Sequence, residues 1–148
     1  MKINITKKQY ALLIKMLYLG DWMINAIKLP DDRNREVDEF FSYILSFAKE
    51  FGMEDMTDED EGEFSASREL DEDDLVQESM EAYNEETFWD ELIDRLAERD
   101  FHRKYSTAEI RAMKDWIERA GHTDEFRDKY AEEFEKNGLD RLEIADGK

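Results

Sequence analysis

Carboxylates are the residues of this chain with the greatest capacity for chemistry, and they are concentrated in one stretch. Residues 53–74 (MEDMTDEDEGEFSASRELDEDD) hold twelve Asp and Glu side chains and a single basic residue, Arg68. Such a cluster can bind a divalent cation, imitate a polyanion or attract a basic partner. For calcium, Asp58, Asp60 and Glu69 fall at positions one, three and twelve of an EF-hand loop. The turn glycine belongs at position six, whereas Gly62 stands at five, so the spacing argues against a specific calcium site.

A second set of carboxylates has a spacing compatible with magnesium. All-helical magnesium-dependent nucleotide pyrophosphohydrolases use Glu-x-x-Glu followed at a distance by Glu-x-x-Asp, and Glu69, Glu72, Glu91 and Asp94 fit this pattern. Residues three apart share a helix face, where two carboxylates can hold one Mg²⁺ ion. Because Asp and Glu account for 40 of the 148 residues, this pattern arises easily by chance. Magnesium-dependent pyrophosphohydrolysis is therefore an alternative function, with Mg²⁺ as its cofactor.

Other catalytic chemistry finds little support in the residue types. The chain has no cysteine and no Gly-x-Ser-x-Gly elbow, and its six glycines are scattered. Arg99 and Arg119 stand three residues before His102 and His122, so the Glu-x-x-His pairs of di-iron bundles are absent. His102 follows Glu98 at the spacing of a surface ion pair, and His122 follows a glycine at an expected helix boundary. A non-catalytic function without a cofactor is favoured over catalysis.

Basic side chains gather at one place in the second half of the chain. Arg95, Arg99 and Arg103 recur at every fourth residue and so share a helix face, which makes them a candidate anion patch. Glu91 stands four residues before Arg95, the spacing of a helical ion pair. Intramolecular pairing is the favoured interpretation, since exposed ion pairs are common.

The elements that must position these side chains are helices. The pattern predicts an all-α bundle of five or six helices, forming a single domain over residues 1–148. Thr6 and Gln9 form a capping box before a strongly apolar helix over Tyr10–Ile27, which we expect at the centre of the bundle. A second capping box, Ser106 and Glu109, opens a later helix.

Further boundaries follow from turn and cap residues. Gly52 is placed to end the second helix, Asn84 to begin a new one, Gly121 to end the helix that follows the second capping box, and Asn137-Gly138 to end the last helix. Residues 53–67 are expected to form an acidic, irregular connection over the surface, and 69–74 the first turn of the next helix. The alternating segments 2–5 and 141–144 predict a short two-stranded pairing of the chain ends.

Charge and composition limit the partners. A net charge of -19 predicts a soluble protein that is repelled by nucleic acid and by anionic membranes. The longest apolar run, 10–27, is interrupted by charged residues, so no membrane span is expected. The absence of cysteine fits a reducing compartment, and we expect a cytoplasmic monomer or homodimer.

Three segments carry a resemblance: QYALLIKMLYLGDWMINAIK, FWDELIDRLAERDF and YAEEFEKNGLDRLEI. Together they cover about a third of the chain and are similar to small acidic helical proteins of bacteria that have no assigned activity. The resemblance implies a bacterial cytosolic helical protein and carries no catalytic or binding residue.

The function expected from the sequence is that of an acidic adaptor or regulatory protein that binds a basic protein surface. Aromatic anchors would supply binding energy, and any exposed tryptophan would be a natural candidate. The alternative is a DNA mimic that inhibits a nucleic-acid-handling protein; mimicry requires an ordered array of charge. The candidate partner-binding residues are Asp58, Glu59, Asp60, Glu61 and Glu63.

Overall fold

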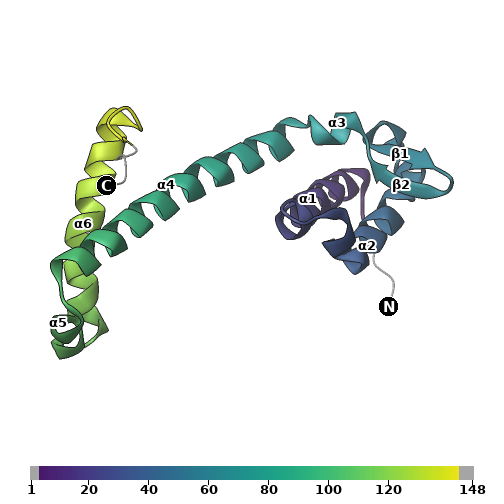
Figure 1. The fold of residues 1–148 in the computed structure, drawn as a ribbon. Coiled ribbons are helices and arrows are strands. Elements are labelled where there is room, and N and C mark those ends of the chain that lie inside the picture. The colour runs from purple at the N-terminus through teal and green to yellow at the C-terminus, as the bar shows by residue number, and fades with distance from the viewer. Residues whose placement is uncertain (1–3, 144–148) are drawn as a thin grey trace. The chain divides into compact units, whose positions relative to one another are not determined.

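A computed structural model describes residues 4–143, and the fold is mostly helical (74%). Its contacts divide the chain into two compact parts, which we name the N-terminal unit (Met1–Ala82) and the C-terminal unit (Tyr83–Lys148) and describe separately. The predicted helical class is confirmed, whereas the single domain over 1–148 stays a prediction. In chain order (Figure 1) the elements are α1 (Lys7–Asn25), η1 (Pro30–Asp32), α2 (Arg35–Leu45), η2 (Ala48–Phe51), η3 (Glu54–Met56), β1 (Thr57–Asp60), β2 (Glu63–Ala66), α3 (Arg68–Asp71), α4 (Asp74–Lys104), α5 (Thr107–Ala112) and α6 (Trp116–Asn137).

Helix α1 begins where the sequence predicts. The Thr6 hydroxyl accepts a hydrogen bond from the Gln9 amide at 3.3 Å, and the Gln9 side chain accepts one from the Thr6 amide at 2.9 Å. This reciprocal capping box satisfies donors that a helix N-terminus otherwise leaves without partners. The capping box predicted at Ser106 and Glu109 is likewise complete and opens α5.

Only one side of α1 lies in the core of the N-terminal unit. Tyr10 and Ile14 are buried there; the Tyr10 ring stacks on Phe51 with centroids 4.2 Å apart, and its hydroxyl donates to the Ile44 carbonyl at 2.8 Å. Helix α1 also exposes large apolar side chains, so its expected place at the centre of a bundle is not observed. The buried core comprises Tyr10, Ile14, Phe41, Leu45, Ala48, Met53, Leu70 and Val76.

Strands β1 and β2 form an antiparallel hairpin within the stretch expected to be an irregular connection. Asp58 pairs with Ser65, and Glu59 with Phe64, across the two strands. The two-residue turn between them is Glu61-Gly62, with φ of 51° and 87°. Two consecutive positive φ angles are typical of the type I′ turn, whose twist suits a hairpin. The irregular conformation expected for 53–67 is not observed, because this turn and the packing of Phe64 against the core order the acidic strands.

The predicted pairing of the chain ends is corrected by the same observation. The described two-stranded sheet lies at residues 57–66 rather than at the termini. Of the segments expected to pair, residues 4–5 and 141–143 are outside any strand, and residues 2, 3 and 144 lie outside the described part of the chain. A hairpin packed on a core is more stable than an isolated two-stranded pairing.

A polar network joins the end of α1 to the start of α2. Buried Asn25 accepts a hydrogen bond from the Asn34 amide at 2.8 Å and donates to Asp21 at 2.7 Å. Arg33 pairs with Asp38 at 2.6 Å and with Asp21 at 3.2 Å. The Arg33 guanidinium lowers the pKa of the Asp38 carboxyl. This network fixes the direction in which α2 leaves α1.

Helices α3 and α4 follow the hairpin. Ser67 caps α3 by accepting from the Leu70 amide, and its hydroxyl donates to the Asp55 carbonyl at 2.6 Å. Helix α4 then runs without interruption from Asp74 to Lys104, so the boundary expected at Asn84 was wrong. Asn is only a weak helix breaker, and nothing in the sequence around it forces a turn.

Within the C-terminal unit, α4 and α6 are joined by aromatic packing, as between Trp89 and Phe134, and by ion pairs. Arg119 pairs with Glu98 at 2.9 Å, and Arg127 pairs with Asp94. Asp115 caps α6, which continues through Gly121 to Asn137; the helix end predicted at Gly121 was wrong, whereas the one at Asn137-Gly138 is confirmed. A single glycine raises the free energy of a helix by only about 1 kcal/mol and does not end one.

Candidate partner-binding groove

Helix α2 has two faces with different roles. Phe41 and Leu45 point into the core and hold the helix in place. On the side toward the hairpin, Ser42 accepts a hydrogen bond from the Phe64 amide at 3.0 Å. This bond satisfies a main-chain donor on the outer edge of β2, which would otherwise be left open. The hairpin is thereby docked on α2.

A groove of about 740 Å³ lies between α2 and the hairpin. Its α2 wall includes Glu39, Ser42 and Tyr43, and its hairpin wall includes Asp60 and Glu63. The other lining residues are Arg35, Asp38, Ser46, Gly62, Phe64 and Ser65. The groove therefore combines carboxylates, hydroxyls and aromatic rings within one compact unit.

Three groove carboxylates, Glu39, Asp60 and Glu63, form no ion pair within the described residues. The ion pairs described in the N-terminal unit join Lys15 to Asp73, Arg33 to Asp21 and Asp38, and Arg68 to Glu72. Within residues 4–143, no ion pair involves Glu39, Asp60 or Glu63. Arg33 neutralises Asp38, and Arg35 is the one cationic group in the groove lining. The groove is thus acidic even with its own arginine counted.

Two of these carboxylates face each other across the hairpin. Asp60 is the cross-strand partner of Glu63, directly before the turn. Like charges at directly opposed positions destabilise a hairpin, by roughly 0.2–1 kcal/mol for pairs of this kind. A bound cation would relieve that repulsion, which makes this pair a point of attraction for a positively charged ligand.

Aromatic surface accompanies the carboxylates. Tyr43 is 59% exposed, and its ring meets Phe47 edge-on at 5.0 Å, which restricts its orientation. Phe64 is half-buried in the other wall. Ring faces next to carboxylates suit Lys and Arg side chains, since both groups attract a cation and the rings accommodate its apolar stem.

The structure distributes the other predicted partner-binding residues along the hairpin. Asp60 and Glu63 line the groove, Glu61 forms the turn, and Asp58 and Glu59 lie on β1. The contribution of α2 was missed by sequence reasoning. A signal was present, since Glu39, Ser42, Tyr43 and Ser46 form a polar stripe at helical spacing opposite the apolar one.

The candidate magnesium residues lie in two separate places along the chain. Glu69 is in α3 and Glu72 caps it, whereas Glu91 and Asp94 belong to the part of α4 in the C-terminal unit. Three of the four pair with an arginine: Glu72 with Arg68, Glu91 with Arg95, and Asp94 with Arg127. Among the described residues, no group of three or more His, Asp or Glu side chains is arranged to hold a metal ion.

The candidate anion patch is occupied by the protein's own carboxylates. Arg95 pairs with Glu91 at 2.8 Å, and Arg99 and Arg103 both pair with Asp100, at 2.9 and 3.3 Å. Hydrogen bonds from Arg99 and from the Tyr130 hydroxyl lower the pKa of the Asp100 carboxyl to about 2. These ion pairs lie within α4, and Arg99 also donates a hydrogen bond to the Tyr130 hydroxyl of α6 at 2.9 Å.

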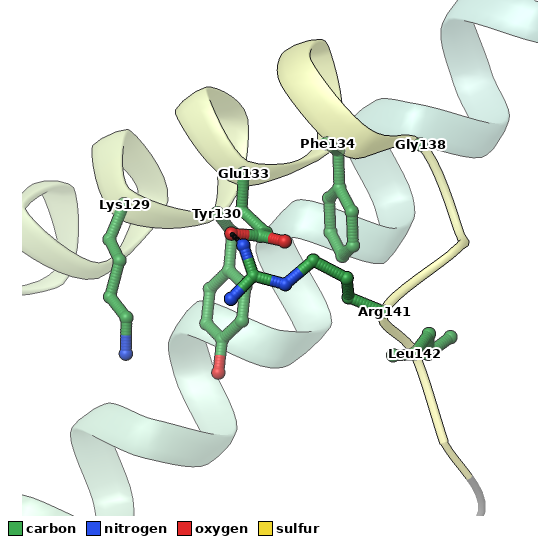
Figure 2. Close-up of a pocket in the computed structure, with 7 residues that line it drawn as sticks. All are labelled: Lys129, Tyr130, Glu133, Phe134, Gly138, Arg141 and Leu142. Carbon is green, nitrogen blue, oxygen red and sulfur yellow. Dashed lines mark hydrogen bonds and ion pairs between the residues drawn. The ribbon is translucent and has the colours of Figure 1, made fainter.

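A smaller pocket of about 240 Å³ lies at the end of α6 in the C-terminal unit (Figure 2). Arg141 extends back toward α6, and its guanidinium pairs with Glu133 at 3.1 Å. Tyr130 and Phe134 line the same pocket, and the Tyr130 hydroxyl donates to Asp100. Lys129 also lines the pocket, and its ammonium group lies 5.6 Å from the centre of the Tyr130 ring.

The tryptophans differ in their surroundings. Trp116 is 77% exposed at the start of α6, whereas Trp89 packs on Phe134 with ring centroids 5.6 Å apart and donates to Glu85 at 2.6 Å. Both belong to the C-terminal unit, and the aromatic side chains that line the acidic groove are Tyr43 and Phe64. His102 pairs with Glu98 at 2.9 Å as predicted, and His122 lies within α6 beside the Tyr105 hydroxyl rather than at a helix end.

Comparison with protein-family models, curated proteins and solved structures found no match to this chain. The resemblance to small acidic bacterial proteins therefore stays a prediction. No described helix has the length and apolar character needed to cross a membrane.

Proposed function

We propose that this protein is a non-catalytic adaptor that binds a Lys- or Arg-bearing segment of a partner protein in the α2–hairpin groove. The observation that carries the proposal is the set of Glu39, Asp60 and Glu63, which line one groove beside Tyr43 and form no ion pair within the described residues. A guanidinium or ammonium group between these carboxylates would form charge-assisted hydrogen bonds and relieve the Asp60–Glu63 repulsion.

The net charge and the groove contribute to binding in different ways: the charge by long-range attraction, and the groove by orienting the partner. A net charge of -19 attracts a basic partner from a distance and accelerates encounter, in a way that weakens with salt. Bulk charge alone gives no preferred orientation. The docked hairpin gives one, because the hydrogen bond from Phe64 to Ser42 fixes the two carboxylate-bearing walls relative to each other.

The test compares two triple variants with the same change in charge. The groove variant carries Glu39→Gln, Asp60→Asn and Glu63→Gln; the control carries Asp31→Asn, Glu78→Gln and Glu81→Gln, at exposed or half-exposed positions outside the groove lining. The probe is fluorescein-labelled octa-arginine, measured by anisotropy at about 150 mM salt, where long-range attraction is screened. We expect the groove variant to bind at least tenfold more weakly, and the control to change less than twofold.

Equal weakening by the two variants would show that only bulk charge matters and would refute the groove. Tyr43→Ala supplies a further check: it leaves the charge unchanged, and we expect it to weaken binding several-fold through loss of cation–π contact. Affinity purification with wild-type and both triple variants as bait then identifies partners that depend on the groove.

Mimicry of a nucleic acid is a second candidate function, favoured by one observation. The acidic strands are ordered in a hairpin, which is what a polyanion mimic requires. The two functions differ in competition: duplex DNA should displace the partner of a mimic at low salt, whereas the partner of an adaptor stays bound. Displacement of every groove-dependent partner by DNA would replace the adaptor proposal with this one.

A further inference from the structure

Helix α1 carries a second apolar face on the side away from the core. Leu12, Met16, Leu19, Met23 and Ile27 are separated by four, three, four and four residues, so they share one side of the helix and its C-terminal extension. Leu19 is half-buried and also packs against the core, whereas the other four are exposed. The exposed fractions are 50% for Leu12, 60% for Met16, 51% for Met23 and 96% for Ile27. We name these five residues the outer face of α1.

The outer face is large for an apolar surface left in water. Its five residues expose on the order of 600 Å², the lower end of the roughly 600–1,000 Å² that each partner contributes to a stable interface. Monomeric proteins seldom leave a larger apolar patch uncovered, and a helix that is apolar on opposite sides is typically buried on both. The area is therefore sufficient for a specific contact.

Gly20 adds a second observation at the edge of this face. A glycine inside a helix raises its free energy by about 1 kcal/mol relative to alanine. No atom lies within 4 Å of the position that a Cβ would occupy there, so packing within the described chain does not require glycine. A missing side chain between Met16 and Met23 leaves room for the close approach of another helix.

The charges around the outer face indicate which partner fits. Residues 5–27 contain Lys7, Lys8 and Lys15 and one carboxylate, Asp21, which pairs with Arg33 at 3.2 Å. Lys15 pairs with Asp73 at 2.6 Å, and Lys7 donates to the Gly52 carbonyl at 2.6 Å. A basic partner would meet lysines here. Two copies of this acidic chain, in contrast, can meet on this face without bringing carboxylates together.

We propose that two copies of the chain pair antiparallel across the outer face of α1. The four, three, four spacing of Leu12, Met16, Leu19 and Met23 reads the same in both directions. A twofold axis between positions 17 and 18 therefore places Leu12 of one copy on Met23 of the other, and Met16 on Leu19. Such an isologous contact closes on itself and yields a dimer. The dimer does not depend on the groove proposed above.

Sedimentation equilibrium of the full chain tests the dimer. We expect wild-type protein to be dimeric at tens of micromolar, and Met16→Glu to raise the dimer dissociation constant at least 100-fold. The matched control is Ile117→Glu, which adds the same charge at a residue of 61% exposure in α6 and should leave the constant within twofold. Circular dichroism confirms that each variant is folded. A monomeric wild type at 100 µM, or equal effects of the two variants, would overturn the proposal.

Cysteine cross-linking tests the antiparallel register, and the natural chain has no cysteine to interfere. Across the proposed axis, the two copies of residue 16 differ by about 4.5 Å along the helix and those of residue 23 by about 16 Å, at 1.5 Å per residue. A disulfide spans about 4.4–6.8 Å between Cα atoms, so Met16→Cys should form cross-linked dimers on oxidation and Met23→Cys should not. Equal cross-linking of both would contradict the antiparallel arrangement. Slow thiol labelling of a monomeric Met16→Cys variant would show that the chain covers this face itself, and would also refute the dimer.

Discussion

Replacing Gly62 or Gly121 by alanine should change the free energy of unfolding in opposite directions, although neither added methyl group contacts another atom. No atom lies within 4 Å of a Cβ built at Gly62 or at Gly121. The difference is in the backbone: Gly62 has a φ of 87° in the hairpin turn, whereas Gly121 lies inside α6. Backbone conformation alone therefore decides the sign of each effect.

The magnitudes follow from the two conformations. An L-residue in the left-handed region costs about 1–2 kcal/mol, so Gly62→Ala should lower the free energy of unfolding of the N-terminal unit by that amount. In a helix, alanine is favoured over glycine by about 1 kcal/mol, so Gly121→Ala should raise the free energy of unfolding of the C-terminal unit. For domains of 60–100 residues, 1 kcal/mol corresponds to a shift in Tm of about 4–8 °C.

Urea denaturation followed by circular dichroism at 222 nm, with hydrogen exchange to assign each change to its unit, measures both effects. A neutral or stabilising Gly62→Ala would show that the turn has no left-handed residue at position 62, and so that the hairpin is not formed as described. A destabilising Gly121→Ala would show that α6 is interrupted at that residue, as the sequence alone predicted.

Three other outcomes can be measured. Leu70→Ala, at a fully buried core position, should lower the free energy of unfolding by about 2–5 kcal/mol in urea denaturation, while Leu75→Ala, at 45% exposure, should change it little; similar effects of the two would contradict the core. Burial raises the pKa of Tyr10 to about 12, and burial with the neighbouring Asp71 raises that of Tyr18 to about 12. Because these values lie above the ordinary 10, the stability contributed by the neutral hydroxyls is complete below pH 10 and is lost toward pH 12. Burial also raises the pKa of Tyr130, so absorbance at 295 nm should show Tyr10, Tyr18 and Tyr130 titrating late. A single transition near pH 10 in folded protein would refute this. For Asp100, whose pKa is lowered to about 2, the stabilising contribution is complete above pH 4 and is lost between pH 4 and 2. Asp100→Asn should therefore flatten the acid dependence of ellipticity in that range, and an unchanged profile would contradict the role of this carboxylate.

The helix starts were predictable from the sequence because their determinants are local. Thr6 with Gln9, and Ser106 with Glu109, cap their helices through bonds between residues three apart, whatever the rest of the chain does. The end of α6 is likewise determined by neighbouring residues, Asn137 and Gly138. The helix boundaries predicted at Asn84 and Gly121 were wrong because these residues only lower the stability of a helix. The residues on either side favour the helix enough for it to continue through them.

The candidate site depended on tertiary structure. The sequence located the carboxylates Asp58, Glu59, Asp60, Glu61 and Glu63, but their density concealed the strand pattern around Phe64 and the turn at Gly62. Docking of the hairpin on α2 joins residues more than twenty positions apart, as in the hydrogen bond from Phe64 to Ser42. No local rule specifies such contacts, because their free energy comes from burial and hydrogen bonds that form only when the fold is complete.

The same distinction applies to charge and to apolar surface. The amino-acid sequence by itself determined that the chain is acidic, mostly helical and free of thiol chemistry, since these properties follow from composition and short-range spacing. Only the tertiary structure decided that Tyr130 of α6 meets Asp100 of α4 and that Glu39 joins the groove. It also decided that one apolar side of α1 is buried while the other is left exposed. Helical periodicity shows that a residue lies on a given face, and the packing of distant elements determines what that face contacts.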